Sequence, residues 1–180
     1  FAERRLNASD RAAQDRRGRG AAFMIGLLFA VGFGALWLHL ALAVSIVGQA
    51  ALALLAATLI AQRSLYAHVR DVADGLDGSL EDGRMAVARI VGRNVDELDE
   101  AGVSRAAIES LAENFSDGVV APTFWLALLG LPGAALYKTI NTADSMIGHK
   151  TARYREFGFA AAKIDDVANW AAARISGALI

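Results

Sequence analysis

The chain has 180 residues, a formal net charge of −1 and 55% hydrophobic residues. This balance lacks the positive charge excess that is typical of nucleic acid binding proteins, so the sequence predicts no nucleic acid partner. Cysteine is absent, which excludes disulfides and thiolate metal sites within this chain. The segments, taken in chain order, predict an all-α, polytopic integral membrane protein that forms one membrane-embedded domain over residues 1–180.

A basic segment, residues 1–20, precedes a long stretch without charged side chains. No Asp, Glu, Lys or Arg occurs from residue 21 to residue 60. As one helix this stretch would be about 60 Å long, roughly twice the hydrocarbon thickness of a bilayer. We therefore predict a transmembrane hairpin over 21–62, with spans at 21–40 and 44–62. The run is too long for a signal peptide and lacks a cleavage site, whereas a buried hairpin in a soluble domain is the remaining alternative.

Arginine residues flank both ends of this hairpin, while the turn between the two spans is uncharged. They are Arg4, Arg5, Arg11, Arg16, Arg17 and Arg19 before the first span, and Arg63 and Arg70 after the second. The positive-inside rule therefore places both ends of the hairpin in the cytoplasm. An arginine cluster of this kind could also bind anionic lipids or a phosphorylated ligand.

The next segment, residues 63–117, has the composition of cytoplasmic helices. Apolar residues recur at helical spacing before Gly92, and a further helix is predicted to begin at Ser104, whose side chain can cap it. This segment should therefore connect the hairpin to the polar block at its end.

That polar block carries acidic side chains at a regular spacing. Glu109, Glu113 and Asp117 recur every four residues, so one α-helix would place them on one face, with Asn114 beside them. No basic residue follows at the spacing that would pair with them. The pattern indicates a metal, proton or catalytic site, and a solvated face of an ordinary amphipathic helix is the alternative.

The apolar segment 118–137 is broken in two. Its first part is too short to span a bilayer comfortably and contains Pro122, and a break follows at Gly130–Gly133. Broken segments at membrane depth occur where they pack against protein or line a polar cavity. Basic residues follow the segment, so both of its flanks are expected in the cytoplasm. We predict a re-entrant hairpin.

Two further polar clusters lie in the segment 138–169, which is predicted to face the cytoplasm. Asn141 lies one helical turn before Asp144, and Asp166 lies one turn before Asn169, with Asp165 adjacent. Their oxygen atoms are ligands suited to Mg²⁺ that carries a phosphate or diphosphate. For each cluster alone, an ordinary helix start is the alternative.

A basic aromatic patch lies between these clusters. It runs from Arg153 to Gly158 and includes Tyr154 and Arg155, and it could hold an anionic substrate. The histidines show no ligand spacing, so the sequence predicts no zinc site. Residues 170–180 are apolar enough to begin another membrane helix.

Several runs of this sequence closely resemble the CobD/CbiB cobalamin biosynthesis family. They are Ala61 to Val69, Ile90 to Arg93, Ala106 to Pro122, Tyr137 to Gly148, Arg153 to Gly158 and Asp165 to Trp170. The resemblance covers essentially the whole chain. Family members are usually near twice this length, with a segment before Phe1 and a further membrane-associated region after Ile180, so we expect the chain to be a fragment.

The resemblance implies an adenosylcobinamide-phosphate synthase in the bacterial inner membrane, with its polar site facing the cytoplasm. Such a ligase joins a corrinoid, adenosylcobyric acid, to (R)-1-amino-2-propanol or its O-phosphate as an amide, using ATP and Mg²⁺. The chain contains no GxxxxGK[ST] motif, so the expectation of ATP rests on the resemblance. The lipid bilayer and other cobalamin biosynthesis enzymes are the remaining candidate partners.

Amide formation from a carboxylate requires activation, metal to offset phosphate charge, and a group that accepts the amine's proton. The catalytic candidates are Glu109, Glu113, Asn114 and Asp117. The metal candidates are Asp144, Asp165 and Asp166. The substrate-binding candidates are Asn141, Arg153, Tyr154, Arg155 and Asn169.

Two other classes of function remain as alternatives. A membrane prenyltransferase would use similar Asn and Asp clusters with Mg²⁺, but it should show two strong Asp-rich motifs, whereas only Asp165–Asp166 comes close. A non-catalytic membrane sensor or regulatory relative would tolerate the loss of the carboxylates at Asp144 and Asp166, which a synthase would not.

Overall fold

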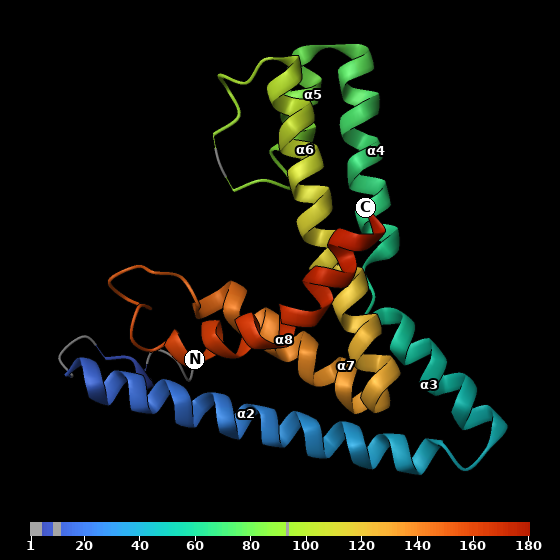
Figure 1. Cartoon of the computed structure of the whole chain (residues 1–180), viewed down its shortest axis with the longest axis vertical. Coiled ribbons are helices and arrows are strands. Elements are labelled where there is room, and N and C mark those ends of the chain that lie inside the picture. The colour runs from blue at the N-terminus through green and yellow to red at the C-terminus, as the bar shows by residue number, and fades with distance from the viewer. Residues whose placement is uncertain (1–4, 9–11, 93) are drawn as a thin grey trace.

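The computed structural model describes residues 5–8, 12–92 and 94–180, and every long regular element among them is a helix (Figure 1). In chain order the elements are α2 (Ala13–Leu42), α3 (Ile46–Thr58), α4 (Gln62–Gly78), α5 (Leu80–Val87), α6 (Glu100–Phe115), the π-helix η1 (Ser116–Val120), α7 (Ala121–Ile147) and α8 (Phe159–Leu179). The all-α class predicted from the sequence is confirmed.

Three stretches of the described chain are long and apolar enough to cross a membrane. They are Ala13–Leu42, Ile46–Gly78 and Glu100–Ile147. The chain is therefore a polytopic membrane protein, as predicted. The second stretch is interrupted, because α3 ends at Thr58 and α4 begins at Gln62. At about 1.5 Å per residue α3 is about 20 Å long, shorter than a hydrocarbon layer of about 30 Å.

The long helix α2 packs mainly along α7 and α8, and α3 diverges from it after the turn (Figure 1). Ser45 begins α3, and its Oγ accepts a hydrogen bond of 3.0 Å from the backbone N–H of Gly48. Near the other end of α2, Met24 and Phe157 are fully buried in one core cluster. The backbones approach closely there, since a Cβ atom on Gly20 would clash with the carbonyl oxygen of Phe157.

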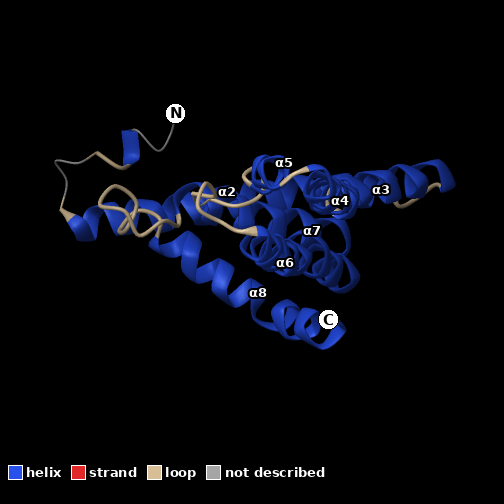
Figure 2. Cartoon of the chain, turned by 90° about the horizontal axis from the view of Figure 1, so that it is seen from above, coloured by secondary structure: helices blue, strands red, loops and turns tan. Residues whose placement is uncertain are grey.

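Helices α4, α5 and α6 form an arm that stands apart from α2 (Figures 1 and 2). Its core contains Val72 of α4, Val87 of α5 and Val103 of α6, each at most 2% exposed. The predicted start of α6 at Ser104 is wrong. The helix begins at Glu100, because Asp99 caps it and accepts a hydrogen bond of 2.7 Å from the backbone N–H of Gly102.

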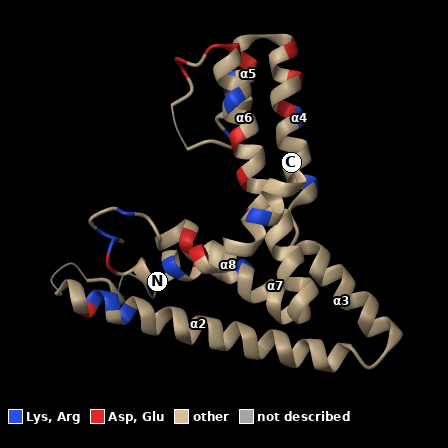
Figure 3. Ribbon diagram, in the orientation of Figure 1, with Lys and Arg blue, Asp and Glu red and all other residues tan. Residues whose placement is uncertain are grey.

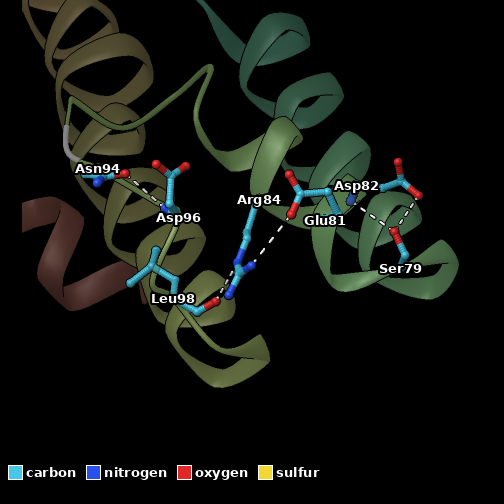
Figure 4. Close-up of polar contacts among 7 residues, drawn as sticks. All are labelled: Ser79, Glu81, Asp82, Arg84, Asn94, Asp96 and Leu98. Atoms are coloured by element: carbon cyan, nitrogen blue, oxygen red, sulfur yellow. Dashed lines mark hydrogen bonds and ion pairs between the residues drawn. The ribbon is translucent and has the colours of Figure 1, made fainter.

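Polar contacts fix the start of α5 and the loop that joins α5 to α6 (Figure 4). Ser79 caps α5 by accepting a hydrogen bond of 3.1 Å from the backbone N–H of Asp82. The Nε of Arg84 donates a hydrogen bond of 2.8 Å to the carbonyl oxygen of Leu98, just before α6. Arg84 therefore ties α5 to the chain that enters α6, and this contact helps to set the position of α6.

The helix that carries the polar block is not one regular α-helix. α6 ends at Phe115, and η1 inserts a turn of π-helix before α7. A π-helix has i→i+5 hydrogen bonds and holds an extra residue in its turn. Asp117 lies in η1 but close enough to Glu113 for their charges to interact, so the shared face of Glu109, Glu113 and Asp117 stays a prediction.

α7 is broken at Gly130, where the chain has φ 65° and ψ −155° and changes direction (Figure 1). Only glycine adopts this left-handed region without strain. The ring of His39 lies against this glycine, with its Cε1 only 3.2 Å from where a Cβ atom would be. The break lies where the sequence predicted it, while the re-entrant course of 118–137 through a membrane stays a prediction.

Charged side chains gather on the arm, at the start of α2, and around the loop between α7 and α8 (Figure 3). The rest of α2 and all of α3 carry no Lys, Arg, Asp or Glu. Residues 170–180 continue α8 without a break, and they project to one side of the other helices in Figure 2. Their insertion into a membrane stays a prediction.

Candidate active site

Three polar segments meet where η1, the second half of α7 and α8 pack together. The polar side chains at this junction are Asp117 of η1, Tyr137, Asn141 and Asp144 of α7, and Asp165 and Asn169 of α8. We call these six residues the acidic site. Segments separated by up to about fifty residues in the sequence are thus brought to one place.

A buried hydrogen-bond network holds the acidic site together. The Tyr137 side chain is 1% exposed, and its hydroxyl lies 2.8 Å from Oδ1 of Asn169 and 3.1 Å from the carbonyl oxygen of Asp117. Nδ2 of Asn169 donates a hydrogen bond of 2.9 Å to Oδ2 of Asp165. This chain of contacts links all three elements and fixes which way the Asn169 amide faces.

The carboxyl group of Asp165 lies in an unusual environment. Burial raises the pKa of Asp165 from 3.8 to about 6; the nearby charges of Asp144 and Asp117 add to the rise, and hydrogen bonds from Asn169 and Asn141 oppose it. Its Oδ1 atom is buried and has no hydrogen-bond partner among the described residues. A buried oxygen of this kind is satisfied by an ordered water, a proton or a bound cation.

Asp144 is held one turn before the end of α7. Its side chain packs against Gly148, where a Cβ atom would clash with Oδ1 of Asp144. The charges of Asp165 and Asp166 both interact with Asp144. Several carboxylates thus lie close together, and like charges at this separation favour a cation between them.

The donor chemistry of the acidic site fits Mg²⁺. The site offers hard oxygen ligands, one of them the unpartnered Oδ1 of Asp165. No three His, Asp or Glu side chains among the described residues are close enough to form a metal site by themselves. Mg²⁺ commonly uses one or two carboxylates and takes its other ligands from substrate phosphates and water. Asp144 and Asp165 are the residues that would hold it in that way.

The predicted catalytic residues of α6 do not all belong to the acidic site. Glu113 is exposed but lies near enough to interact electrostatically with Asp117. Glu109 is exposed, one turn further away. Asn114 donates hydrogen bonds of 2.8 and 3.1 Å to the backbone and side-chain oxygens of Ser110. Its amide is therefore engaged with Ser110 and not with the residues of the acidic site.

The predicted basic patch lies in the loop between α7 and α8. The guanidinium of Arg153 lies 5.5 Å from the centre of the Tyr154 ring, and the Arg155 side chain is exposed. Tyr154 itself packs against the core beside Phe157. Asp166, a predicted metal ligand, forms an exposed ion pair of 2.9 Å with Lys163. The roles of these residues stay predictions.

Sequence analysis missed two features of this region. Tyr137 ends the predicted apolar segment and is not among the predicted site residues. Its position one helical turn before Asn141 is the sequence signal that indicates its place in the site. Arg16 was assigned to topology, but its Nε donates a hydrogen bond of 2.8 Å to Asn7 and its Nη2 donates to the carbonyl oxygen of Arg153. Arg16 therefore fixes the loop that carries the basic patch.

Comparison with known proteins identifies the family. The family described as "CobD/Cbib protein" matches residues 1–180. A relative from Sinorhizobium sp, "Cobalamin biosynthesis protein CobD", is 53% identical over 182 residues, which cover 100% of this chain and 56% of the relative. A relative with the same name in Brucella melitensis biotype 1 is 51% identical over 99% of this chain and 55% of the relative. Another in Rhodobacter capsulatus is 57% identical over 69% of this chain and 40% of the relative.

The chain spans little more than half the length of the relatives that it matches from end to end. No solved structure matches it. The match over the full chain, together with the identity of about half of its residues, is sufficient to assign it: this chain belongs to the CobD/CbiB protein family.

Proposed function

We propose that this chain is the part of a cobalamin biosynthesis enzyme in which the acidic site supports formation of an amide bond. The proposed reaction joins adenosylcobyric acid to (R)-1-amino-2-propanol or its O-phosphate and consumes ATP. The observation that carries the proposal is the convergence of Asp117, Asp144 and Asp165, with a buried unpartnered oxygen on Asp165. Membership in a family whose relatives are named for cobalamin biosynthesis gives the substrate class.

The proposed chemistry assigns separate tasks to the residues of the site. ATP transfers a phosphoryl or adenylyl group to the corrinoid carboxylate; the amine nitrogen then forms the C–N bond, and the activated oxygen leaves with the phosphate. Mg²⁺ would offset the charge of the phosphate oxygens. Asp144 and Asp165 would hold the ion, with Asp166 at the edge of the site. Asp117, with Glu113 beside it, would accept the proton that the amine loses.

The loop before α8 would bind the anionic parts of the substrates. Arg153 and Arg155 carry the positive charge, and Tyr154 anchors the loop in the core. Asn141 and Asn169 would orient polar groups next to the metal. Because Arg16 holds the backbone of this loop, the positions of Arg153 and Arg155 depend on the start of α2.

The charge pattern supports a site that faces the cytoplasm of a bacterial inner membrane. Basic residues precede α2, and others follow α7, whereas the turn between α2 and α3 is uncharged.

The experiment uses membranes that contain the full-length protein, supplied with adenosylcobyric acid, aminopropanol phosphate and ATP, with and without Mg²⁺. Mass spectrometry measures the amide. We expect product that requires both ATP and Mg²⁺, and loss of at least 100-fold in Asp144→Asn and Asp165→Asn, because each change removes a ligand charge. Asp96→Asn, at an exposed position on the arm, is the matched control and should keep full activity.

Two results would contradict the proposal. One is the absence of product from well-inserted protein when free aminopropanol has also been tried. The other is full activity in both carboxylate variants, which would favour a non-catalytic role for the acidic site.

A further inference from the structure

A cavity of about 280 Å³ is lined by residues of α4, the turn after α5 and α6, none of which belongs to the acidic site. α4 lines it with Ser64 and His68, the turn after α5 with Arg89, and α6 with Ser110 and Asn114. Its base is close to η1, because the backbone N–H of Ala61, which also lines it, donates a hydrogen bond of 2.8 Å to the carbonyl oxygen of Gly118. The cavity therefore adjoins the π-helix that carries Asp117 but is separate from the acidic site.

Hydrogen bonds fix one wall of this cavity. Ser110 is 5% exposed, and its Oγ donates a hydrogen bond of 2.9 Å to the carbonyl oxygen of Ile90. Asn114 donates both of its contacts to Ser110, as described above. These hydrogen bonds hold Ser110 and Asn114 in position on the α6 wall without a ligand.

The opposite wall offers hydrogen-bond donors to a ligand. Nδ1 of His68 lies 3.4 Å from Oγ of Ser64, so the other ring nitrogen of His68 is left for a further partner. Arg89 also lines the cavity, and one terminal nitrogen of its guanidinium lies 3.7 Å from Asp71, which leaves its other N–H groups for a ligand. The donors therefore come from α4 and the turn after α5.

The charge and size of the cavity select the class of ligand. None of the described residues that line it is acidic, while Arg89 carries a full positive charge. A guanidinium beside an imidazole N–H donor is an arrangement that can bind oxyanions such as phosphate. The volume lies below the range of roughly 300–1,000 Å³ that is usual for drug-sized ligands, so the ligand must be small.

We infer that this cavity binds the phosphate group of a small phosphorylated ligand, with Arg89 and His68 as the donors and with Ser64, whose hydroxyl lies 3.4 Å from Nδ1 of His68, orienting the ring. Only the identity of that ligand rests on the proposed function, in which the natural candidate is the phosphorylated amine. The binding itself does not depend on amide formation, so the two ideas can fail separately.

The test measures binding of inorganic phosphate and of O-phosphoethanolamine to the purified full-length protein in detergent by isothermal titration calorimetry, with acetate as a comparison anion. We expect saturable binding of the phosphate compounds and at least tenfold weaker binding of acetate. Arg89→Gln should weaken phosphate binding about tenfold or more, because a charge-assisted contact is lost. Arg105→Gln, at an exposed position on α6, is the matched control and should bind as wild type does.

A second variant separates ligand binding from a structural role of Arg89. Asp71→Asn removes the ion pair of Arg89 but leaves the cavity walls intact. If Arg89 binds the ligand, phosphate affinity in this variant is unchanged or higher. Affinity that falls in Asp71→Asn as much as in Arg89→Gln would overturn the inference, as would binding that survives Arg89→Gln or no binding of either phosphate compound.

The two probes identify the source of the phosphate group. Tighter binding of O-phosphoethanolamine assigns the cavity to a phosphorylated small molecule, and equal binding assigns it to free phosphate. Either result supports a phosphate site. Amide formation without phosphate binding would refute this inference and support the proposed function. Phosphate binding without amide formation would support this inference and contradict the proposed function.

Discussion

The hydroxyl of Tyr137 lies 2.8 Å from Oδ1 of Asn169, and the packing of α7 against α8 buries the Tyr137 side chain and partly buries Asn169. This contact decides the orientation of the Asn169 amide, since its oxygen accepts from Tyr137 and its nitrogen must then donate to Asp165. Tyr137 therefore controls the position of a carboxylate that it does not touch.

Tyr137→Phe should keep the shape of the core but leave the Asn169 oxygen without its donor. We expect a loss of stability of about 1–2 kcal/mol, because a buried acceptor becomes unsatisfied, and a loss of amide formation of about tenfold. Thermal unfolding in detergent and the mass spectrometric assay measure the two effects. Tyr66→Phe, at a position 67% exposed, is the control. Wild-type behaviour of Tyr137→Phe in both assays would contradict the role of the network.

The pKa of Asp165, raised by burial to about 6, predicts how stability depends on pH. An unfolded Asp titrates near 3.9, so the folded state binds the proton more tightly than the unfolded state does. This contribution to stability is fully present below about pH 4 and is lost as pH rises through about 6. Wild type should therefore lose stability relative to Asp165→Asn across this window. A constant difference between the two proteins from pH 4 to pH 7 would contradict the raised pKa.

Gly148→Ala should displace the carboxylate of Asp144, because the new Cβ would clash with its Oδ1. We expect amide formation to fall by about 10- to 100-fold, since displacing a reacting or metal-binding group by about 1 Å has effects of that size. The Mg²⁺ concentration needed for half-maximal activity should also rise. Gly177→Ala, where a Cβ meets no other atom within 4 Å, is the control and should be active.

Gly18 and Gly20, which are separated by one residue in α2, should respond in opposite ways to substitution by alanine. Gly20→Ala should cost about 1–3 kcal/mol, because its Cβ would clash with the backbone of Phe157, which cannot move aside as a side chain can. Gly18→Ala meets nothing within 4 Å and should gain about 0.5–1 kcal/mol from helix propensity. Equal effects at the two positions would show that α2 does not pack against the loop before α8.

The predicted re-entrant course of 118–137 can be tested by labelling. This chain contains no cysteine, so single cysteines at Ser104 and Lys150 can be introduced cleanly. Both should react with a membrane-impermeant reagent from the cytoplasmic side only. Labelling of the two positions from opposite sides would instead show that the segment between them crosses the membrane.

The course of the main helices could be predicted because it follows from local composition. A charge-free run of this length identifies two apolar helices, and Gly130 with Pro132 identifies a break. The end of α3 could not be predicted, because residues 59–61 include no glycine or proline. The chain leaves the helix there, and Ala61 bonds to Gly118, a partner far away in the sequence.

The candidate site was predictable in its residue types but not in its grouping. The spacing paired Asp166 with Asn169, whereas Asn169 donates to Asp165 in the structure and Asp166 forms an exposed ion pair with Lys163. The π turn of η1 also could not be read from a period of 3.6 residues. Burial of Tyr137 likewise depends on packing between two helices that local patterns do not describe.

The π-helix η1 makes the site depend on the length of the chain as well as on its residues. Removing one residue from Ser116–Val120 would take out the extra residue that the π turn holds, so that a single α-helix could run from α6 into α7. The apolar composition of α7 would be unchanged, but the backbone around Asp117, whose carbonyl oxygen accepts from Tyr137, would be rebuilt. A deletion too small to alter hydropathy would thus disturb the acidic site.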